Sequence, residues 1–139
     1  MLPEFDANGN LPPGVHVASV SEVLECFSRS GTSARLFRTR SLRLFIDLVG
    51  SLASALYIDG SYITEKLAPN DVDIAVVLSE DFAFTNLNLA AFKRLERQFK
   101  ELDIYPRKVN TPQLSSLVDF WCKDRDGNPK GIVYVELQE

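Results

Sequence analysis

The residues in this sequence best suited to chemistry are Asp71 and Asp73, which alternate with apolar residues at the start of an apolar run. In an extended strand successive side chains point to opposite faces, so these two carboxylates project to the same side. Magnesium takes oxygen ligands in near-octahedral geometry, commonly one or two carboxylates with water and substrate phosphates completing the shell. The spacing therefore predicts a metal-nucleotide site.

A Gly60-Ser61 pair precedes the aspartates and supplies groups that suit a phosphate. Gly60 lacks a side chain, which lets a phosphate approach the backbone closely. Ser61 adds a hydroxyl and an amide at a turn, where consecutive N–H groups form an anion-binding nest. The pair is therefore predicted to hold the phosphate tail of a nucleotide.

A purely structural role accounts for the same residues and stays open at this point. Gly60-Ser61 is also a common turn, and Asp71 is suited to accept hydrogen bonds from local backbone groups. Asp73 is then simply an aspartate in contact with solvent. Motif matches of this kind are hypotheses until the structural context is known.

Two apolar strands must position these residues, one over 56–59 before the Gly-Ser turn and one over 72–78 with the aspartates at its start. A polar connection interrupted by Pro69 joins them. A long helix over 34–54 is expected to lead into the first strand, because apolar residues recur in steps of three and four. The stripe predicted to face the core consists of Phe37, Ser41, Leu44, Leu48, Leu52 and Ala55, widened by Phe45 and Val49.

The first half of this helix carries four arginines with no acid among them: Arg35, Arg38, Arg40 and Arg43. Arg29 lies just before the helix. One interpretation is a solvated basic face whose aliphatic stems lie over the core. The other is a contact surface for a nucleotide, for RNA phosphates or for an acidic partner. The spacing does not decide between them.

The remaining elements are short and are separated by turns. Residues 1–17 carry the turn signals Asn8-Gly9-Asn10 and Pro12-Pro13-Gly14 and are predicted to form a turn-rich N-terminal arm. The other predicted elements are a short helix beginning near Ser19, a helix around 89–99, a strand over 102–105 that Pro106 demotes to an edge, a helix over 113–121 and a closing strand over 132–137.

Composition bounds the class of protein. A chain of 139 residues with 45% hydrophobic residues fits one globular domain. The formal net charge of −4 argues against bulk attraction to nucleic acid, although a local basic patch still binds phosphate. No apolar run is long enough to span a bilayer, and no secretory signal pattern opens the chain, so we expect no membrane association and a cytoplasmic location.

The sequence resembles the nucleotidyltransferase superfamily that includes DNA polymerase β. That superfamily carries an apolar residue, Gly-Ser or Gly-Gly, roughly a dozen residues, and then an acid-apolar-acid-apolar run. The matching residues are Gly60, Ser61, Asp71, Val72, Asp73 and Ile74. Less specifically, Pro3 to Asp6 and Leu11 to Gly14 are similar to the opening of small bacterial nucleotidyltransferase-like proteins, so the likeness covers most of the chain.

The resemblance implies an α+β fold, with a nucleotidyltransferase-like mixed sheet backed by helices and a single domain over residues 1–139. It implies two Mg²⁺ ions held by Asp71 and Asp73, with ATP or another nucleoside triphosphate as substrate. Gly60 and Ser61 would grip the β- and γ-phosphates. Superfamily members often carry an arginine a few residues after Gly-Ser, whereas here Lys66 is the only candidate for that contact.

The superfamily also places a third carboxylate on the strand beside the Asp-x-Asp strand, and Asp103 is the candidate in this order. It would complete the metal site and accept the proton of the acceptor hydroxyl. A solvated aspartate at a strand end is the alternative for Asp103, and Asp119 and Glu136 are substitutes for the third carboxylate.

The expected activity is transfer of a nucleoside monophosphate, AMP from ATP, to a hydroxyl of a protein, RNA or small-molecule acceptor. Small members of the superfamily often work beside a helical ribonuclease toxin and modify it, so the resemblance also implies a toxin-antitoxin role. The alternative is a non-catalytic protein of the same fold that binds and neutralises a protein partner. Direct nucleotide addition to RNA is a third possibility.

Overall fold

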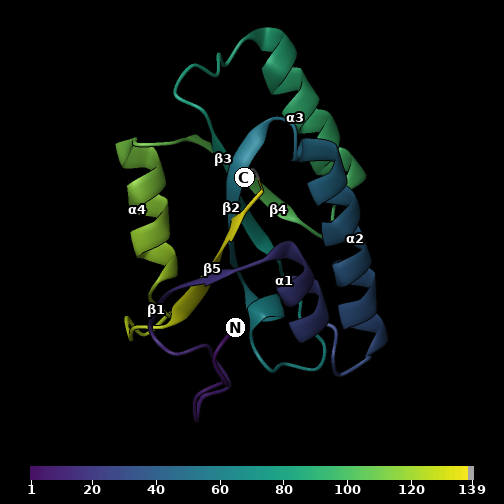
Figure 1. Ribbon diagram of the computed structural model, residues 1–139, viewed down its shortest axis with the longest axis vertical. Helices are drawn as coiled ribbons and strands as arrows, with labels where there is room; N and C mark the ends of the chain where they lie inside the picture. Colours follow the sequence, from purple (N-terminus) through teal and green to yellow (C-terminus); the bar gives the residue numbers. More distant parts are fainter. Residues whose placement is uncertain (138–139) are drawn as a thin grey trace.

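The computed structural model describes residues 1–137 and is built from a sheet with helices on both faces (Figure 1). In chain order the elements are β1 (Gly14–Ala18), α1 (Val20–Cys26), α2 (Ser33–Val49), β2 (Ala53–Asp59), the 3-10 turn η1 (Ser61–Ile63), β3 (Asp73–Leu78), α3 (Asn86–Gln98), β4 (Asp103–Lys108), α4 (Pro112–Trp121) and β5 (Gly131–Glu136).

The strands form one mixed sheet in the order β1-β5-β2-β3-β4. β2 runs antiparallel to both of its neighbours, whereas β1 pairs with β5, and β4 with β3, in parallel. Helices α1, α2 and α3 lie on one side of the sheet and α4 on the other (Figure 1). The predicted α+β class, a mixed sheet backed by helices, is therefore confirmed. None of the helices within residues 1–137 is long and apolar enough to cross a membrane.

Polar side chains fix where each helix begins. Ser19, Thr32, Thr85 and Thr111 are in extended conformation, and each side-chain oxygen accepts a hydrogen bond from the backbone N–H three residues later. A side-chain acceptor at this position satisfies one of the backbone donors left free at a helix start. The predicted starts of α1 and α4 are thereby confirmed, and Pro112 follows its cap at the first helical position, where its missing N–H costs nothing.

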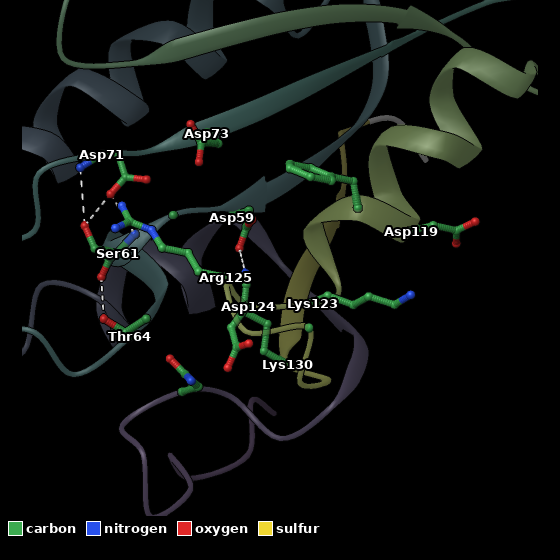
Figure 2. A pocket seen from close by; sticks show the side chains of 14 residues that line it. Asp59, Ser61, Thr64, Asp71, Asp73, Asp119, Lys123, Asp124, Arg125 and Lys130 are labelled. Atoms are coloured by element: carbon green, nitrogen blue, oxygen red, sulfur yellow. Dashed lines mark hydrogen bonds and ion pairs between the residues drawn. The ribbon is translucent and has the colours of Figure 1, made fainter.

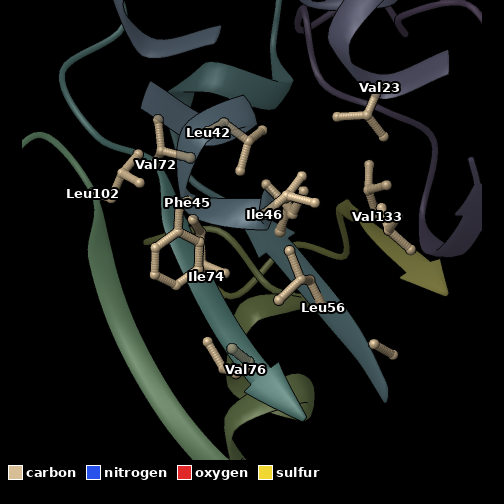
Figure 3. Close-up of a cluster of buried hydrophobic side chains, with 14 of the residues drawn as sticks. Val23, Leu42, Phe45, Ile46, Leu56, Val72, Ile74, Val76, Leu102 and Val133 are labelled. Carbon is tan, nitrogen blue, oxygen red and sulfur yellow. The ribbon is translucent and has the colours of Figure 1, made fainter. Parts of the chain in front are cut away.

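The core lies between α2 and the sheet (Figure 3). Leu42 and Phe45 of α2 are fully buried and face Ile74 and Val76, which alternate along β3 with residues buried on the opposite face of the sheet. Leu56 of β2 and Val133 of β5 extend the same cluster. Burial of such side chains contributes about 1.5–3 kcal/mol each, so this face anchors the central strands.

Helix α2 differs from the sequence prediction in its length and in the face it buries. The helix ends at Gly50 rather than near residue 54, because residues from Ala53 onward pair with β3 as part of β2. The predicted stripe is only partly confirmed: Ser41, Phe45, Val49 and Ala55 are buried, whereas four of its members are exposed to about half of their area: Phe37, Leu44, Leu48 and Leu52. The buried face lies to one side of it and includes Leu42, Phe45, Ile46 and Val49. Both stripes follow helical spacing, so periodicity alone did not distinguish them.

The N-terminal arm is more ordered than its turn signals predicted. Its last residues belong to β1, which pairs with β5 from Gly14 opposite Gly131 to Ala18 opposite Val135. Leu2 and Leu11 are buried in the core. At the other edge, β4 continues through Pro106, which an edge strand tolerates because one side of it has no partner strand.

Candidate functional site

Three aspartates lie abreast at one end of the sheet. Asp73 opens β3 and is paired in register with Asp59 on β2 and with Asp103 on β4. Residues paired in this way project to the same face of a sheet. The strand register thus brings together three carboxylates that are far apart in the sequence.

This row faces the side of the sheet covered by α4. Alternation along β4 places Tyr105 on the same face as Asp103, and the Tyr105 ring contacts Trp121 of α4 with centroids 5.6 Å apart. The opposite face of β3 holds Ile74 and Val76, which pack under α2. The aspartates therefore lie on the face away from the main core, where α4 ends.

Asp71 lies just before β3 and is held by the Gly60-Ser61 turn. Its Oδ1 atom accepts hydrogen bonds from the Ser61 amide at 3.1 Å and the Ser61 hydroxyl at 2.6 Å (Figure 2). The same hydroxyl accepts a hydrogen bond from the Asn70 amide at 2.9 Å. Asp71 thus has the structural role that the alternative interpretation allowed, with Ser61 as its partner, and the Ser61 donors expected to hold a phosphate are engaged by this carboxylate.

Gly60 makes the close approach of the two segments possible. Its φ of 96° lies in the left-handed region that favours glycine. A Cβ atom at Gly60 would lie 2.7 Å from the Asp71 carbonyl oxygen and 3.0 Å from its Oδ2. Gly60 therefore serves to bring the turn against Asp71.

Arg35 holds the connection that follows Gly60-Ser61. Only 3% of the residue is exposed, and its guanidinium points at backbone carbonyls. It donates to Phe27 at 3.1 Å, to Tyr62 at 2.7 Å, to Lys66 at 2.6 Å and also to Thr64. The solvated or ligand-binding role considered for the arginine group is thus wrong for Arg35, because all of these acceptors are buried or half-buried loop carbonyls.

A cavity of about 800 Å³ opens at the end of α4. That size falls within the range of small-molecule pockets, about 300–1,000 Å³. Its lining combines the β2–β3 connection with the segment between α4 and β5 (Figure 2). The main polar and aromatic residues are Asp59, Ser61, Thr64, Asp71, Asp73, Asp119, Phe120, Lys123, Asp124, Arg125 and Lys130.

The electrostatics of the cavity centre on Asp73. Burial, the charge of Asp71 and the hydrogen-bonded Asp103 carboxyl together raise the pKa of Asp73 to about 7. Burial also acts to raise the pKa of Asp71, but the hydrogen bonds from Ser61 outweigh it and leave that pKa lowered. Close carboxylates resist ionising together unless a cation compensates them. Asp73 is therefore the carboxyl that binds a proton most readily, and a bound cation would displace that proton to solvent.

Asp59 differs from Asp73 and Asp103 because a lysine side chain pairs with its carboxylate. Its carboxylate forms an ion pair with Lys130 of the segment before β5. Burial raises the pKa of Asp59, and the Lys130 ammonium opposes that effect. The ion pair also ties the α4–β5 segment to the end of β2.

The donor set fits a hard cation, because Asp71 and Asp73 offer carboxylate oxygens with no nitrogen or sulfur ligand nearby in the cavity lining. Among residues 1–137, no group of three or more His, Cys, Asp or Glu side chains is already arranged to hold a metal ion. Two carboxylates are enough for magnesium when substrate phosphates and water complete the shell. Asp71 and Asp73 are therefore the residues that would hold it.

The other predicted site residues lie at different places. Asp103 contacts Asp73 but is exposed and lines a smaller hollow beside α3 and β4. Lys66 is exposed on the loop and does not line the cavity. Of the substitutes for the third carboxylate, Asp119 lines the cavity, whereas Glu136 pairs with Ala55 toward the opposite end of β2 from Asp59.

Sequence reasoning did not identify several residues of this cavity, among them Asp59, Phe120, Arg125 and Lys130. Asp59 directly precedes Gly60 and closes an apolar strand, so its position was a signal. Phe120 is 75% exposed although it lies in an amphipathic helix. For Arg125 and Lys130 no local signal exists, because only the path of the chain from α4 to β5 brings them to the aspartates.

Comparison with known proteins gives one match. Residues 3–136, almost the whole chain, match the model of a family described as a family of unknown function, DUF6932. Neither the search of curated proteins nor the search of solved structures found a match.

Proposed function

We propose that this chain, which belongs to the DUF6932 family of unknown function, is a magnesium-dependent nucleotidyltransferase of the DNA polymerase β-like superfamily. It would transfer a nucleoside monophosphate, AMP from ATP, to a hydroxyl of a protein, RNA or small-molecule acceptor. The proposal combines the Gly-Ser and Asp-x-Asp spacing with the cavity in which those residues meet.

One observation carries the proposal: Asp73 is half-buried between Asp71 and Asp103, and its burial together with these carboxylates raises its pKa to about 7. A protein gains no stability from bringing ionised carboxylates together without a cation. Lys130, the cation that touches the row, pairs with Asp59 instead. The arrangement is therefore understandable as a preformed site for a divalent cation and the phosphates that accompany it.

The residues have distinct roles in this proposal. Asp71 and Asp73 hold Mg²⁺, which when bound lowers the pKa of a hydroxyl and neutralises phosphate charge. The acceptor oxygen attacks the α-phosphorus, the bond to the β-phosphate oxygen breaks, and pyrophosphate leaves. Asp103, beside Asp73 and open to solvent, accepts the hydroxyl proton. Phe120 offers an exposed ring on the cavity wall for stacking of the base.

The cellular setting follows from the substrate. Nucleoside triphosphate and magnesium are both abundant in the cytoplasm, and we propose that location. A helical ribonuclease toxin is one protein acceptor that this proposal accommodates, with the chain acting as its antitoxin.

Calorimetric titration of ATP with Mg²⁺ tests the site directly. The wild type is compared with an Asp71→Asn/Asp73→Asn double variant, and an Asp47→Asn/Asp81→Asn variant changes the net charge equally at exposed positions. We expect Mg²⁺-dependent binding in the wild type and the control, and none in the site variant. Asparagine still accepts the Ser61 hydrogen bonds, so far-UV circular dichroism should remain the same for all three.

Labelled ATP incubated with the protein and cell extract then tests transfer. A labelled product that forms with the wild type and not with the site variant identifies the acceptor. A folded wild type that binds none of the four nucleoside triphosphates would contradict the proposal.

A second candidate function, a non-catalytic protein that binds a partner, is favoured by the outer face of α2. Phe37, Leu44 and Leu48 are each about half exposed and lie on one stripe of that helix. Arg40 and Arg43 are exposed beside them. If nucleotide binding fails, loss of partner capture in a Phe37→Ser/Leu48→Ser variant would support this role, whereas strongly salt-dependent RNA binding lost in an Arg40→Gln/Arg43→Gln variant would support contact with RNA.

A further inference from the structure

The cavity beside Asp71 and Asp73 has one wall whose charged residues are all acidic and one wall that carries its cationic residues. The β2–β3 connection contributes Asp59, Asp71 and Asp73. The segment from the end of α4 to β5 contributes three cationic residues, Lys123, Arg125 and Lys130, together with the acids Asp119 and Asp124. A phosphate-bearing ligand bound through a metal on the acidic wall would meet the cationic wall with its remaining charge.

Two of these three cations are directed elsewhere. The Lys130 ammonium forms the ion pair with Asp59, which occupies it. The Lys123 side chain extends away from Ser61 and Asp71 (Figure 2). Neither is therefore placed to meet phosphates that lie beside Asp71.

Arg125 is placed differently. Its side chain extends from the turn toward Ser61 and Asp71 (Figure 2). Within residues 1–137 its guanidinium forms no hydrogen bond or ion pair, so all five N–H donors are available. An arginine directed into a cavity without a protein partner is suited to a ligand with several anionic oxygens.

The turn that carries Arg125 is rigidly built. The Asp124 carboxylate accepts hydrogen bonds at 2.9 Å from the amides of Asp126 and Asn128. The Asp124 amide donates to the Asn128 carbonyl, and Lys123 pairs with Pro129 in an isolated bridge. The Lys130 ion pair then fixes the turn against β2. Preorganisation of this kind lowers the entropy lost when a side chain grips a ligand.

The opposite wall lacks the donors that the sequence predicted for a phosphate. The Ser61 amide and hydroxyl both donate to Asp71. Lys66 lies outside the cavity, and its carbonyl, like that of Thr64, accepts hydrogen bonds from Arg35. The triphosphate of a nucleotide bound here would therefore find its cationic contact on the other wall.

We propose that Arg125 binds the polyphosphate of the substrate. Superfamily members often have an arginine shortly after Gly-Ser; this chain lacks it after Gly60-Ser61, and Arg125 on the α4–β5 turn would take its place. The identity of the ligand as a nucleoside triphosphate rests on the proposed function. A guanidinium contacts two phosphate oxygens at once through its planar fork, which a lysine cannot reproduce. Arg125 is thus a binding residue that selects triphosphate over monophosphate.

The test uses inorganic tripolyphosphate, ATP and AMP, each titrated with Mg²⁺ into the wild type, Arg125→Gln, Arg125→Lys and a matched control, Arg94→Gln. Arg94 is exposed on α3, on the other side of the sheet, and its replacement changes the net charge equally. We expect Arg125→Gln to weaken tripolyphosphate and ATP binding at least about tenfold, with a smaller change for AMP. Arg125→Lys should fall between the two, and the control should match the wild type.

The outcomes separate this inference from the proposed function. Equal tripolyphosphate affinity for the wild type and Arg125→Gln would overturn the role of Arg125. If tripolyphosphate binds through Arg125 but no nucleotide is transferred, the contact stands and the proposed transferase activity fails. A folded wild type that binds neither tripolyphosphate nor ATP would overturn both.

Discussion

Arg35 and Asp73 are charged groups in opposite circumstances. Arg35 is 3% exposed, and backbone carbonyls accept from each of its guanidinium nitrogens. Asp73 is half-buried beside like charges, and its pKa rises to about 7 as a result. The charge of Arg35 is satisfied by the chain, whereas no cationic side chain pairs with Asp73 within residues 1–137.

The difference separates a residue that maintains the loop from the carboxylates that we propose bind a cation. A buried charge surrounded by acceptors stabilises the segment that supplies them, provided every donor is used. Clustered carboxylates cost stability until a cation arrives. The two regions are adjacent along the chain, because the loop that Arg35 fixes is the one whose Ser61 holds Asp71.

Removing the satisfied charge should have the largest effect. Arg35→Met leaves buried or half-buried carbonyls of Phe27, Tyr62, Thr64 and Lys66 without their donor. Each unsatisfied group costs about 1–3 kcal/mol, so we expect a loss of about 3–5 kcal/mol in the free energy of unfolding. Urea denaturation followed by circular dichroism measures it.

Arg40→Met is the matched control, because Arg40 is exposed on the same helix. We expect it to change the free energy of unfolding by less than about 0.5 kcal/mol. Equal losses in the two variants would mean that the carbonyl contacts of Arg35 contribute little to the fold.

The next largest effect is expected at Gly60, where the two regions touch. Gly60→Ala places a Cβ atom 2.7 Å from the Asp71 carbonyl at a φ of 96°. Gly127 has a φ of 81° but nothing within 4 Å of its ideal Cβ, so Gly127→Ala carries the backbone strain alone. We expect losses of about 2–4 kcal/mol for Gly60→Ala and about 1 kcal/mol for Gly127→Ala.

The comparison between the two alanine variants isolates the contact with Asp71. Thermal unfolding and Mg²⁺-dependent ATP binding are measured on both. If the two glycines prove equally tolerant, the close approach of Gly60 to Asp71 has no role in holding the carboxylate.

Removing the unsatisfied charge should instead stabilise the protein. The folded pKa of Asp73 lies near 7, above its ordinary value of 3.8, so the folded state binds the proton more tightly than the unfolded state does. Its contribution to stability is present below about pH 4 and is lost as the pH rises through about 7. Asp73→Asn lacks this loss, and we expect it to exceed the wild type by about 1–2 kcal/mol at about pH 8.

The sign of that prediction is tested by repeating the denaturation at about pH 4.5, where the difference between the two proteins should nearly vanish. Titrating groups remote from Asp73 act equally in both proteins and cancel, whereas Asp71 and Asp103, which interact with Asp73, do not. An Asp73→Asn variant less stable than the wild type at about pH 8 would show that the carboxylate is already compensated.

The affinity for Mg²⁺ should depend on pH through the same titration of Asp73. Magnesium competes with the proton on Asp73, so its affinity should fall about tenfold for each pH unit below about 7 and level off above it. Mg²⁺ titrations of the wild type across this range measure the slope, and Asp73→Asn should remove it along with the binding. A flat profile would place the bound ion away from Asp73.

Much of the fold could be predicted from the sequence, because local signals determine where several helices and strands lie. The caps Ser19 and Thr111 mark helix starts, and the apolar runs over 72–78 and 132–137 correspond to β3 and β5. The buried face of α2 was predicted only in part, at Phe45 and Val49. Its two apolar stripes have the same period, and only contact with the sheet selects Leu42 and Ile46 over Leu44 and Leu48.

The candidate site likewise has a part that the sequence predicts and a part that it does not. The proximity of Gly60-Ser61 to Asp71 follows from a turn and two flanking strands, which short-range patterns describe. The alignment of Asp59 and Asp103 with Asp73 depends on strand order and register, and the position of Arg125 depends on where α4 returns the chain to β5. No spacing in the sequence encodes those distances.

The smallest effect is expected at Lys66, which the sequence alone favours as a phosphate contact and which the fold leaves exposed outside the cavity. Its carbonyl accepts from Arg35, so the backbone there is held while the ammonium is free in solvent. Lys66→Ala keeps that carbonyl and should change ATP affinity by less than about twofold, the scale of a screened surface charge. A loss as large as that expected for Arg125→Gln would mean that the loop moves Lys66 into the cavity when nucleotide binds, and that the clamp by Arg35 opens in the process.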